Sequence, residues 1–152
     1  YKGVADWNPI MEVKNHPDIE IPIFGNGDID SAEKAVLYKD TYGTDGIMIG
    51  RAAIGYPWIF REIKHFMATG EHLAPPTLEE RVNTCIAHFN FSMDWKAELL
   101  GIFEMRRHYT NYFRGLRNFK PIRMRLVESK DPKEILDILE SIKHQFVNND
   151  FL

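Results

Sequence analysis

The sequence predicts an α/β unit followed by an all-α bundle, and three observations support this fold class. Two short apolar runs, 19–25 and 45–49, each end in glycine followed by a polar or charged residue, as buried parallel strands do at a ligand-binding edge. Strand patterns give way to helical periodicity after a linker at 71–76, whose two final prolines no helix can cross. The chain has 152 residues, enough for two small domains. We therefore place the domains at 1–71 and 77–148.

The first unit alternates helices and strands. The expected helices are 8–16, 31–41 and one that opens at Pro57, with a helical turn at 52–54. Asn8 is the expected cap of the first helix and Asp30 that of the second. Two parallel strands alone leave both sheet edges unpaired and one face uncovered. We therefore expect this unit to be the last part of a larger α/β barrel or doubly wound sheet.

The second unit contains only helical patterns. A capping box, Thr77-x-x-Glu80, opens its first helix. Further helices are expected at about 97–116, from Pro121, and from a cap at Asp131. On the 97–116 helix, the residues expected on the core side are Ile102, Met105, Tyr109, Tyr112 and Leu116. The pattern predicts a helical bundle.

Composition narrows the class of protein. A single cysteine excludes a disulfide framework and favours a reducing, cytoplasmic setting. No apolar run approaches the length of a membrane span. The net charge is −3, yet the segment 106–130 carries eight Lys and Arg against one acid, a charge of +7. The remaining residues must then carry −10, and this segregation predicts a polyanionic partner for one surface.

The two glycine-ended strands predict an anion site. Glycine N–H groups and the Arg51 guanidinium suit a phosphate, while Asn26 and Asp28 can bond hydroxyl groups. In a TIM barrel, the loops after strands seven and eight commonly form a phosphate site. Gly27 and Asp28 could instead serve only a turn and a helix cap.

Four sequence strings together carry a family resemblance. They are Tyr1-x-Gly3-x-Ala5-Asp6-Trp7, Pro22-x-x-Gly25-Asn26-Gly27-Asp28-Ile29, Asp45-Gly46-x-Met48-Ile49-Gly50-Arg51-Ala52 and Pro57-Trp58-Ile59-Phe60. The chain resembles the C-terminal half of the tRNA-dihydrouridine synthases. The resemblance implies the last two βα units of a TIM barrel, incomplete here, followed by a helical tRNA-binding domain.

The resemblance also implies a cofactor and a reaction. FMN would be held by Asn26, Gly27 and Asp28 after strand seven and by Gly50 and Arg51 after strand eight. The parent enzyme would reduce uridine in tRNA to 5,6-dihydrouridine, with NAD(P)H restoring the flavin. The family's catalytic cysteine lies in an N-terminal half that this sequence lacks. We therefore expect the chain alone to be inactive, to contain no catalytic residue, and to hold FMN weakly or not at all.

The basic segment supplies the expected RNA-binding residues. These are Arg106, Arg107, Arg114, Arg117, Lys120, Arg123 and Arg125. The first four fall within an arc of about 100° if one helix continues to Arg117. Such an arc suits a phosphate backbone, and the resemblance implies tRNA.

No metal site is expected, because Cys85-x-x-His88 is a pair without further ligands, and Cys85 is expected to be a buried structural thiol.

Two alternative functions remain open. One is a stand-alone helical RNA-binding module. The other is part of a different flavin- or sugar-phosphate-binding TIM barrel, with a helical appendage that dimerises. Self-association through the open barrel edge is a further expectation.

Overall fold

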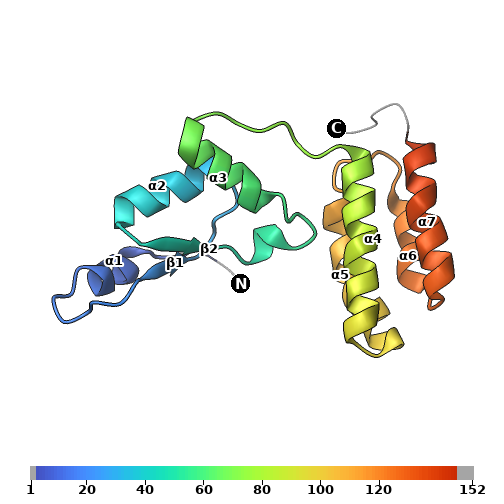
Figure 1. The fold of residues 1–152 in the computed structure, drawn as a ribbon, viewed down its shortest axis with the longest axis horizontal. Helices are drawn as coiled ribbons and strands as arrows, with labels where there is room; N and C mark the ends of the chain where they lie inside the picture. The colour runs from blue at the N-terminus through green and yellow to red at the C-terminus, as the bar shows by residue number, and fades with distance from the viewer. Residues whose placement is uncertain (1–2, 147–152) are drawn as a thin grey trace. The chain divides into compact units, whose positions relative to one another are not determined.

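A computed structural model describes residues 3–146 and divides the chain into two compact units, one ending at Ala74 and the other beginning at Pro75 (Figure 1). The described residues form seven α-helices, one short 3₁₀ helix and one two-stranded parallel sheet. The predicted order, α/β first and all-α second, is confirmed at this level. No helix in the described part of the chain is long and apolar enough to cross a membrane.

The first unit is one βαβ element with helices before and after it. Its elements are α1 (Asn8–Lys14), β1 (Phe24–Asn26), α2 (Ala32–Tyr42), β2 (Gly46–Met48), η1 (Arg51–Ala53) and α3 (Ile59–Thr69). The strands are parallel, with Phe24 opposite Gly46 and Asn26 opposite Met48. This register brings the carboxyl ends of both strands to the same edge, where the Asp28 and Arg51 loops begin.

Trp7 is the centre of the first unit's core. Its side chain is 1% exposed and packs with Ala35, Ile59 and other buried residues from α2 and α3. The Tyr38 and Tyr42 rings lie 5.0 and 5.5 Å from the Trp7 ring, centroid to centroid. The segment before α1 therefore contributes the largest fully buried side chain of this unit.

The opposite face of the sheet is not covered within the first unit. Side chains alternate along a strand, so Phe24 and Asn26 lie on the face of β1 away from Trp7. Phe24 is 64% exposed, and Met48, which pairs with Asn26, is 59% exposed. Large apolar side chains on a parallel sheet are normally covered on both faces. This face therefore has the character of an interior surface.

Two predicted helix caps are wrong by one residue or more. Asn8 does not cap α1; its backbone N–H and side-chain amide both donate to Asp6 Oδ1, at 3.0 and 2.9 Å. Asp30 does not cap α2, because Ser31 Oγ accepts the Lys34 N–H at 3.2 Å. The N-cap of α1 is Trp7, which makes no side-chain cap bond, whereas at α2 the neighbouring hydroxyl of Ser31 takes the cap role. Sequence spacing alone does not decide between such neighbours.

The strands are shorter than the predicted 19–25 and 45–49. The strands begin at Phe24 and Gly46, and just before them the Asp45 N–H donates to the Ile23 carbonyl at 2.9 Å. Asp45 Oδ2 accepts the Ile23 N–H at 2.7 Å, and the Lys14 ammonium lies 2.7 Å from the same oxygen. The bond from Lys14, and next the bond from the Ile23 N–H, hold the pKa of Asp45 below its ordinary value against the opposing effect of desolvation. Lys14 thereby fastens the end of α1 to the start of β2.

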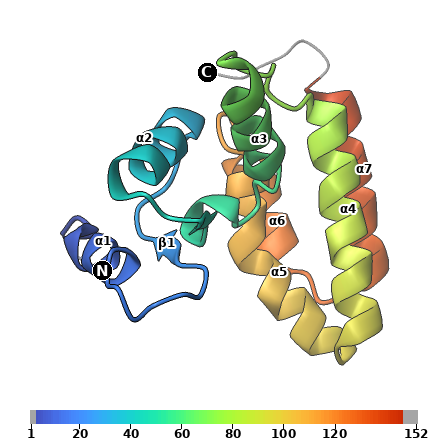
Figure 2. The same ribbon diagram turned by 60° about the vertical axis from the view of Figure 1, so that its left-hand side comes forward.

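The second unit is a ring of four helices around one core. They are α4 (Leu78–Trp95), α5 (Glu98–Tyr112), α6 (Lys120–Glu128) and α7 (Pro132–Gln145). Each packs against the next, and α7 closes the ring against α4 (Figure 2). The Thr77–Glu80 capping box forms in full, with Thr77 Oγ1 accepting the Glu80 N–H and Glu80 accepting the Thr77 N–H. The predicted core side chains of α5 are all buried.

Helix α5 ends at Tyr112, four residues before the predicted end at Leu116. Gly115 has φ +92° and Asn118 has φ +55°, so the chain turns twice through left-handed conformations before α6. Arg114 and Arg117 therefore lie in this connection and not on α5. The arc that placed all four arginines on one helix is wrong, because a glycine stop outweighed the helical periodicity.

Candidate functional site

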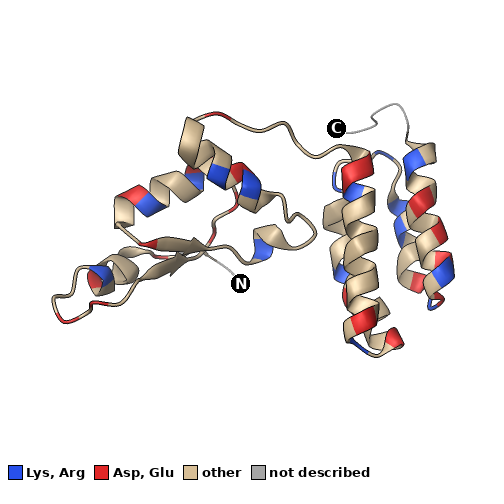
Figure 3. Ribbon diagram, in the orientation of Figure 1, with Lys and Arg blue, Asp and Glu red and all other residues tan. Residues whose placement is uncertain are grey.

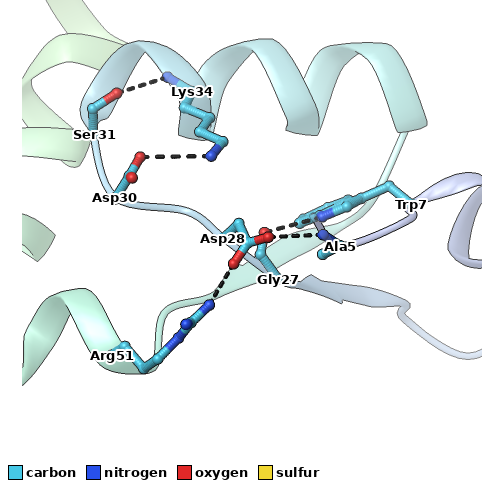
Figure 4. A network of polar contacts seen from close by, with 8 residues as sticks. All are labelled: Ala5, Trp7, Gly27, Asp28, Asp30, Ser31, Lys34 and Arg51. Carbon is cyan, nitrogen blue, oxygen red and sulfur yellow. Dashed lines mark hydrogen bonds and ion pairs between the residues drawn. The ribbon is translucent and has the colours of Figure 1, made fainter. Parts of the chain in front are cut away.

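Asp28 and Arg51 meet at the carboxyl ends of β1 and β2 (Figure 4). Arg51 Nη2 donates to Asp28 Oδ1. The other carboxylate oxygen, Oδ2, accepts the backbone N–H of Ala5 at 2.7 Å. The Asp28 side chain is 21% exposed and the Arg51 side chain 68%. One carboxylate thus joins the segment before α1 to the loop after β2.

Asp28 is held ionised in an unusual backbone conformation. Its φ is +53°, in the left-handed region where aspartate is tolerated better than most residues. The hydrogen bond from Ala5 lowers the pKa of Asp28 most, the positive charge of Arg51 lowers it further, and desolvation opposes both. The carboxylate therefore stays charged at neutral pH and remains a partner for the guanidinium.

Gly25 in β1 and Gly27 just after it are required by packing against the segment before α1. A Cβ added at Gly25 would lie 2.5 Å from Trp7 Cη2 and closer still to Cζ3. A Cβ at Gly27, where φ is +143°, would lie 2.5 Å from Ala5 Cβ. The Trp7 indole Nε1 also donates to the Gly27 carbonyl at 3.0 Å. Gly25 and Gly27 therefore make room for Trp7 and Ala5, a reason that glycine spacing alone did not reveal.

Gly50 has different surroundings. A Cβ added there would meet no atom within 4 Å, and the adjacent Arg51 side chain is largely exposed. Open space beside a bare backbone and a guanidinium fits a phosphate group. Gly50 and Arg51 thus leave room and positive charge for an anion, whereas the Cβ side of Gly27 is already filled by Ala5. Asn26 is exposed on the uncovered sheet face, two residues before Asp28.

The predicted RNA-binding residues divide by exposure. Five are exposed in the second unit: Arg107, Arg114, Arg117, Lys120 and Arg125. Figure 3 shows Lys and Arg along α6 and in the connection that precedes it. Arg123 is half-buried and donates to Thr110 Oγ1 at 3.1 Å, which ties α6 to α5. The basic segment therefore presents its charge mainly from the α5–α6 connection and the two helices beside it.

Arg106 is a packing residue in the structure. Its guanidinium carbon lies 4.5 Å from the centre of the Phe103 ring. Its Nε is buried and has no hydrogen-bond partner among the described residues. A half-buried guanidinium stacked on an aromatic ring is stabilised in place and is less available to a phosphate than its exposed neighbours.

His88 and His108 are half-buried and Cys85 is buried in the second unit, whereas His144 is exposed. His88 and His108 pack with ring centroids 4.6 Å apart, and His88 Nδ1 lies 3.2 Å from the Tyr112 hydroxyl. Cys85 is buried, and burial strongly raises the pKa of its thiol. Cys85 is therefore a structural thiol, as predicted. Within residues 3–146, no three His, Cys, Asp or Glu side chains are grouped to hold a metal ion.

Comparison with known proteins extends over nearly the whole chain. The dihydrouridine synthase (Dus) family profile matches residues 1–148. A relative from Pseudomonas putida, named tRNA-dihydrouridine synthase B, is 39% identical over 131 residues, covering 86% of this chain and 38% of the relative. The Shewanella oneidensis tRNA-dihydrouridine synthase B is 44% identical over 108 residues, which cover 71% of this chain and 33% of that protein.

A probable tRNA-dihydrouridine synthase from Rickettsia bellii is 31% identical over 150 residues, covering 99% of this chain and 45% of that protein. The chain thus spans less than half the length of these relatives. The profile match agrees with the motifs at both strand ends, where Asp28 and Arg51 meet. The chain belongs to the dihydrouridine synthase (Dus) family.

Proposed function

We propose that this chain forms the last two βα units of a TIM barrel and the helical tRNA-binding part of an FMN-dependent tRNA-dihydrouridine synthase. The observation that carries the proposal is the Asp28–Arg51 edge beside Gly50, in a chain that the family profile matches from 1 to 148. The uncovered face that bears Phe24 and Met48 supports the barrel, because further strands would enclose it. The domains would then be 1–71 and 77–148.

The bound FMN would supply the hydride chemistry, and this chain would hold one end of the cofactor. Gly50 and Arg51 would bind the phosphate, and Asn26 would face the ribityl chain from the sheet surface. Reduction of uridine in tRNA with NAD(P)H requires the remainder of the barrel. Cys85 cannot serve as the acid that protonates uracil, since it is buried and its pKa is raised. We therefore propose that the chain alone is inactive and retains little or no FMN.

A chimeric enzyme tests the function. The stretch of the Pseudomonas putida synthase that aligns with this chain is replaced by the corresponding residues, which include Asp28 and Arg51. The chimera is expressed in a strain lacking dihydrouridine synthases, and dihydrouridine in tRNA is measured by mass spectrometry. We expect dihydrouridine to return and Arg51→Ala to reduce it strongly. A folded chimera that binds FMN and tRNA yet forms no dihydrouridine would contradict the proposal.

The tRNA-binding role rests on the exposed cations of the second unit. We propose that Arg107, Arg114, Arg117, Lys120 and Arg125 contact the phosphate backbone, with Arg106 and Arg123 supporting them from half-buried positions. Binding of the 152-residue chain to tRNA is measured by titration at several salt concentrations. Arg114→Gln with Arg117→Gln is expected to weaken binding and to lower the salt-dependence slope by about 2, one per lost phosphate contact.

A matched variant controls for net charge. Lys133→Gln with Lys143→Gln removes the same two charges from α7, where Lys143 pairs with Glu140 at 2.7 Å. This variant is expected to bind tRNA as the parent does. Equal losses in both double variants would show that only net charge matters. Strong tRNA binding by the chain with an inactive chimera would favour the stand-alone RNA-binding module.

A further inference from the structure

We propose that Asp28 is a positioning residue for the cofactor phosphate: it holds the Arg51 guanidinium at the strand edge and does not itself bind the ribityl chain. The inference rests on the proposed FMN site. It changes the role expected for Asp28 from the sequence, where its carboxylate was expected to bond ribityl hydroxyls. Three features of the first unit carry it.

The first feature is the engagement of both carboxylate oxygens. Oδ1 accepts from Arg51 Nη2, and Oδ2 accepts from Ala5 N–H at 2.7 Å (Figure 4). These two donors, one of them charged, orient the carboxylate and leave fewer of its lone pairs to a ribityl hydroxyl. The geometry therefore favours contacts within the protein over contacts with a ligand.

The second feature is the rigid support behind the carboxylate. Gly27 is fastened by the bond from Trp7 Nε1 to its carbonyl, at 3.0 Å, and Trp7 is 1% exposed. Ala5, the donor to Asp28, lies two residues before that same buried indole. The carboxylate is thus fixed to the core, while the side chain that it holds, Arg51, is 68% exposed. A fixed anion beside a long, exposed cation limits the rotamers that the cation can adopt.

The third feature is the place to which Arg51 is held. Its neighbour Gly50 faces open space, and a guanidinium is a planar fork of five donors, so the bond to Asp28 restricts the orientation of the whole group. Preorganising that fork lowers the entropy lost when a phosphate binds. Asp28 then raises the affinity for the phosphate by orienting Arg51, although its own negative charge repels the phosphate. Removing that charge therefore weakens phosphate binding if orientation dominates and strengthens it if repulsion dominates.

The first test needs no flavin. Nuclear magnetic resonance of the 152-residue chain follows the Asp28 carboxyl and the Ala5 amide during an acid titration. We expect both to report one midpoint below the ordinary aspartate value of about 3.9, and Arg51→Gln to raise it. Asp28→Asn is expected to increase the mobility of the Arg51 side chain. An unchanged midpoint and an Arg51 that is equally mobile in both proteins would overturn the inference.

The second test compares two probes that differ only by the phosphate. The chain is titrated with FMN and with riboflavin, and amide shifts at Gly50 and Arg51 give the affinities. Asp28→Asn is expected to weaken FMN binding by about fivefold while riboflavin binding stays within twofold. In the Arg51→Gln background, Asp28→Asn is expected to have no further effect. Equal losses for FMN and riboflavin would indicate a direct ribityl contact, and tighter FMN binding would indicate simple repulsion; either result overturns the inference.

A neighbouring variant supplies the control. Asp30→Asn removes the same charge two residues away, at a carboxylate whose partner is Lys34, at 3.7 Å. It is expected to leave FMN affinity and Arg51 mobility unchanged. If the parent chain gives no shift with FMN, as its incomplete cofactor pocket allows, the FMN and riboflavin affinities are compared in the chimera with the Pseudomonas putida synthase, and a folded chimera without FMN would show that the proposed cofactor site fails. The acid titration still decides whether Asp28 positions Arg51.

Discussion

The substitution Gly25→Ala tests the packing of Trp7 that supports the carboxyl ends of β1 and β2. In Gly25→Ala, the new Cβ would lie 2.5 Å from Trp7 Cη2, whereas carbon atoms in contact prefer about 3.5–4.0 Å. Trp7 cannot retreat easily, because it is 1% exposed and its ring packs against Tyr38 and Tyr42. Overpacking of this kind costs about 2–3 kcal/mol. With a urea dependence of about 1 kcal/mol per M for so small a unit, the unfolding midpoint would fall by about 2 M or the transition would disappear.

The assay must report the first unit alone. The chain has three tryptophans, and Trp95, in the second unit, is 84% exposed, so Trp95→Phe is a mild change that leaves Trp7 and Trp58 as reporters. Urea unfolding is followed by tryptophan fluorescence in that background. Gly50→Ala is the matched control, since its Cβ would meet no atom within 4 Å. If Gly25→Ala unfolds within about 0.5 kcal/mol of the parent, the close packing of Trp7 on β1 is wrong.

Three further predictions concern the second unit. Thr77→Ala removes the acceptor for the Glu80 N–H, so it should destabilise the unit by about 1 kcal/mol and speed hydrogen exchange of the most protected α4 amides about fivefold. Burial lowers the pKa of His108 to about 4, with the neighbouring His88 and Arg107 adding to the effect and Glu104 opposing it; burial and Arg107 also lower the pKa of His88. Because the unfolded chain then binds more protons between pH about 6.5 and 4, stability is fully present above this range and is lost as the pH falls through it. Hydrogen exchange of α5 at pH 7 and pH 5, corrected for intrinsic rates, measures this loss, and a loss of equal size in His108→Gln would exclude the histidine as its cause. Cys85 should react with a thiol reagent only after unfolding, because it is buried with a raised pKa; rapid reaction of the folded chain would contradict its place in the core.

Helical periodicity and capping motifs predicted the second unit well. The Thr77 capping box, the buried face of α5 and the cap at Asp131 all follow from spacing and side-chain chemistry within a few residues. The end of α5 was missed because the chain leaves the helix before Gly115, which adopts a left-handed conformation that glycine tolerates without strain. Periodicity over Leu116 and Arg117 gave no sign of that competition.

The candidate site at the carboxyl ends of β1 and β2 was predicted in part. The sequence located Gly50 and Arg51 at the end of β2, and Asn26 to Asp28 after β1. It could not show that Trp7 and Ala5 occupy the space beside Gly25 and Gly27, since that contact joins residues about 20 apart through the fold. The clue was the string Ala5-Asp6-Trp7, whose large aromatic residue needs small neighbours when buried. The bond from Ala5 to Asp28 is also non-local, so the carboxylate was expected to face a ligand.

The FMN content of the chimera with the Pseudomonas putida synthase tests the proposed cofactor site most directly. Flavin absorbance per protein is measured after purification for the parent chimera, for Arg51→Ala and for Lys133→Gln as a control distant in sequence. We predict about one FMN per parent and Lys133→Gln molecule, and substantial loss in Arg51→Ala, because the phosphate loses its guanidinium. Full FMN occupancy in Arg51→Ala would contradict the placement of the cofactor phosphate at the Asp28–Arg51 edge.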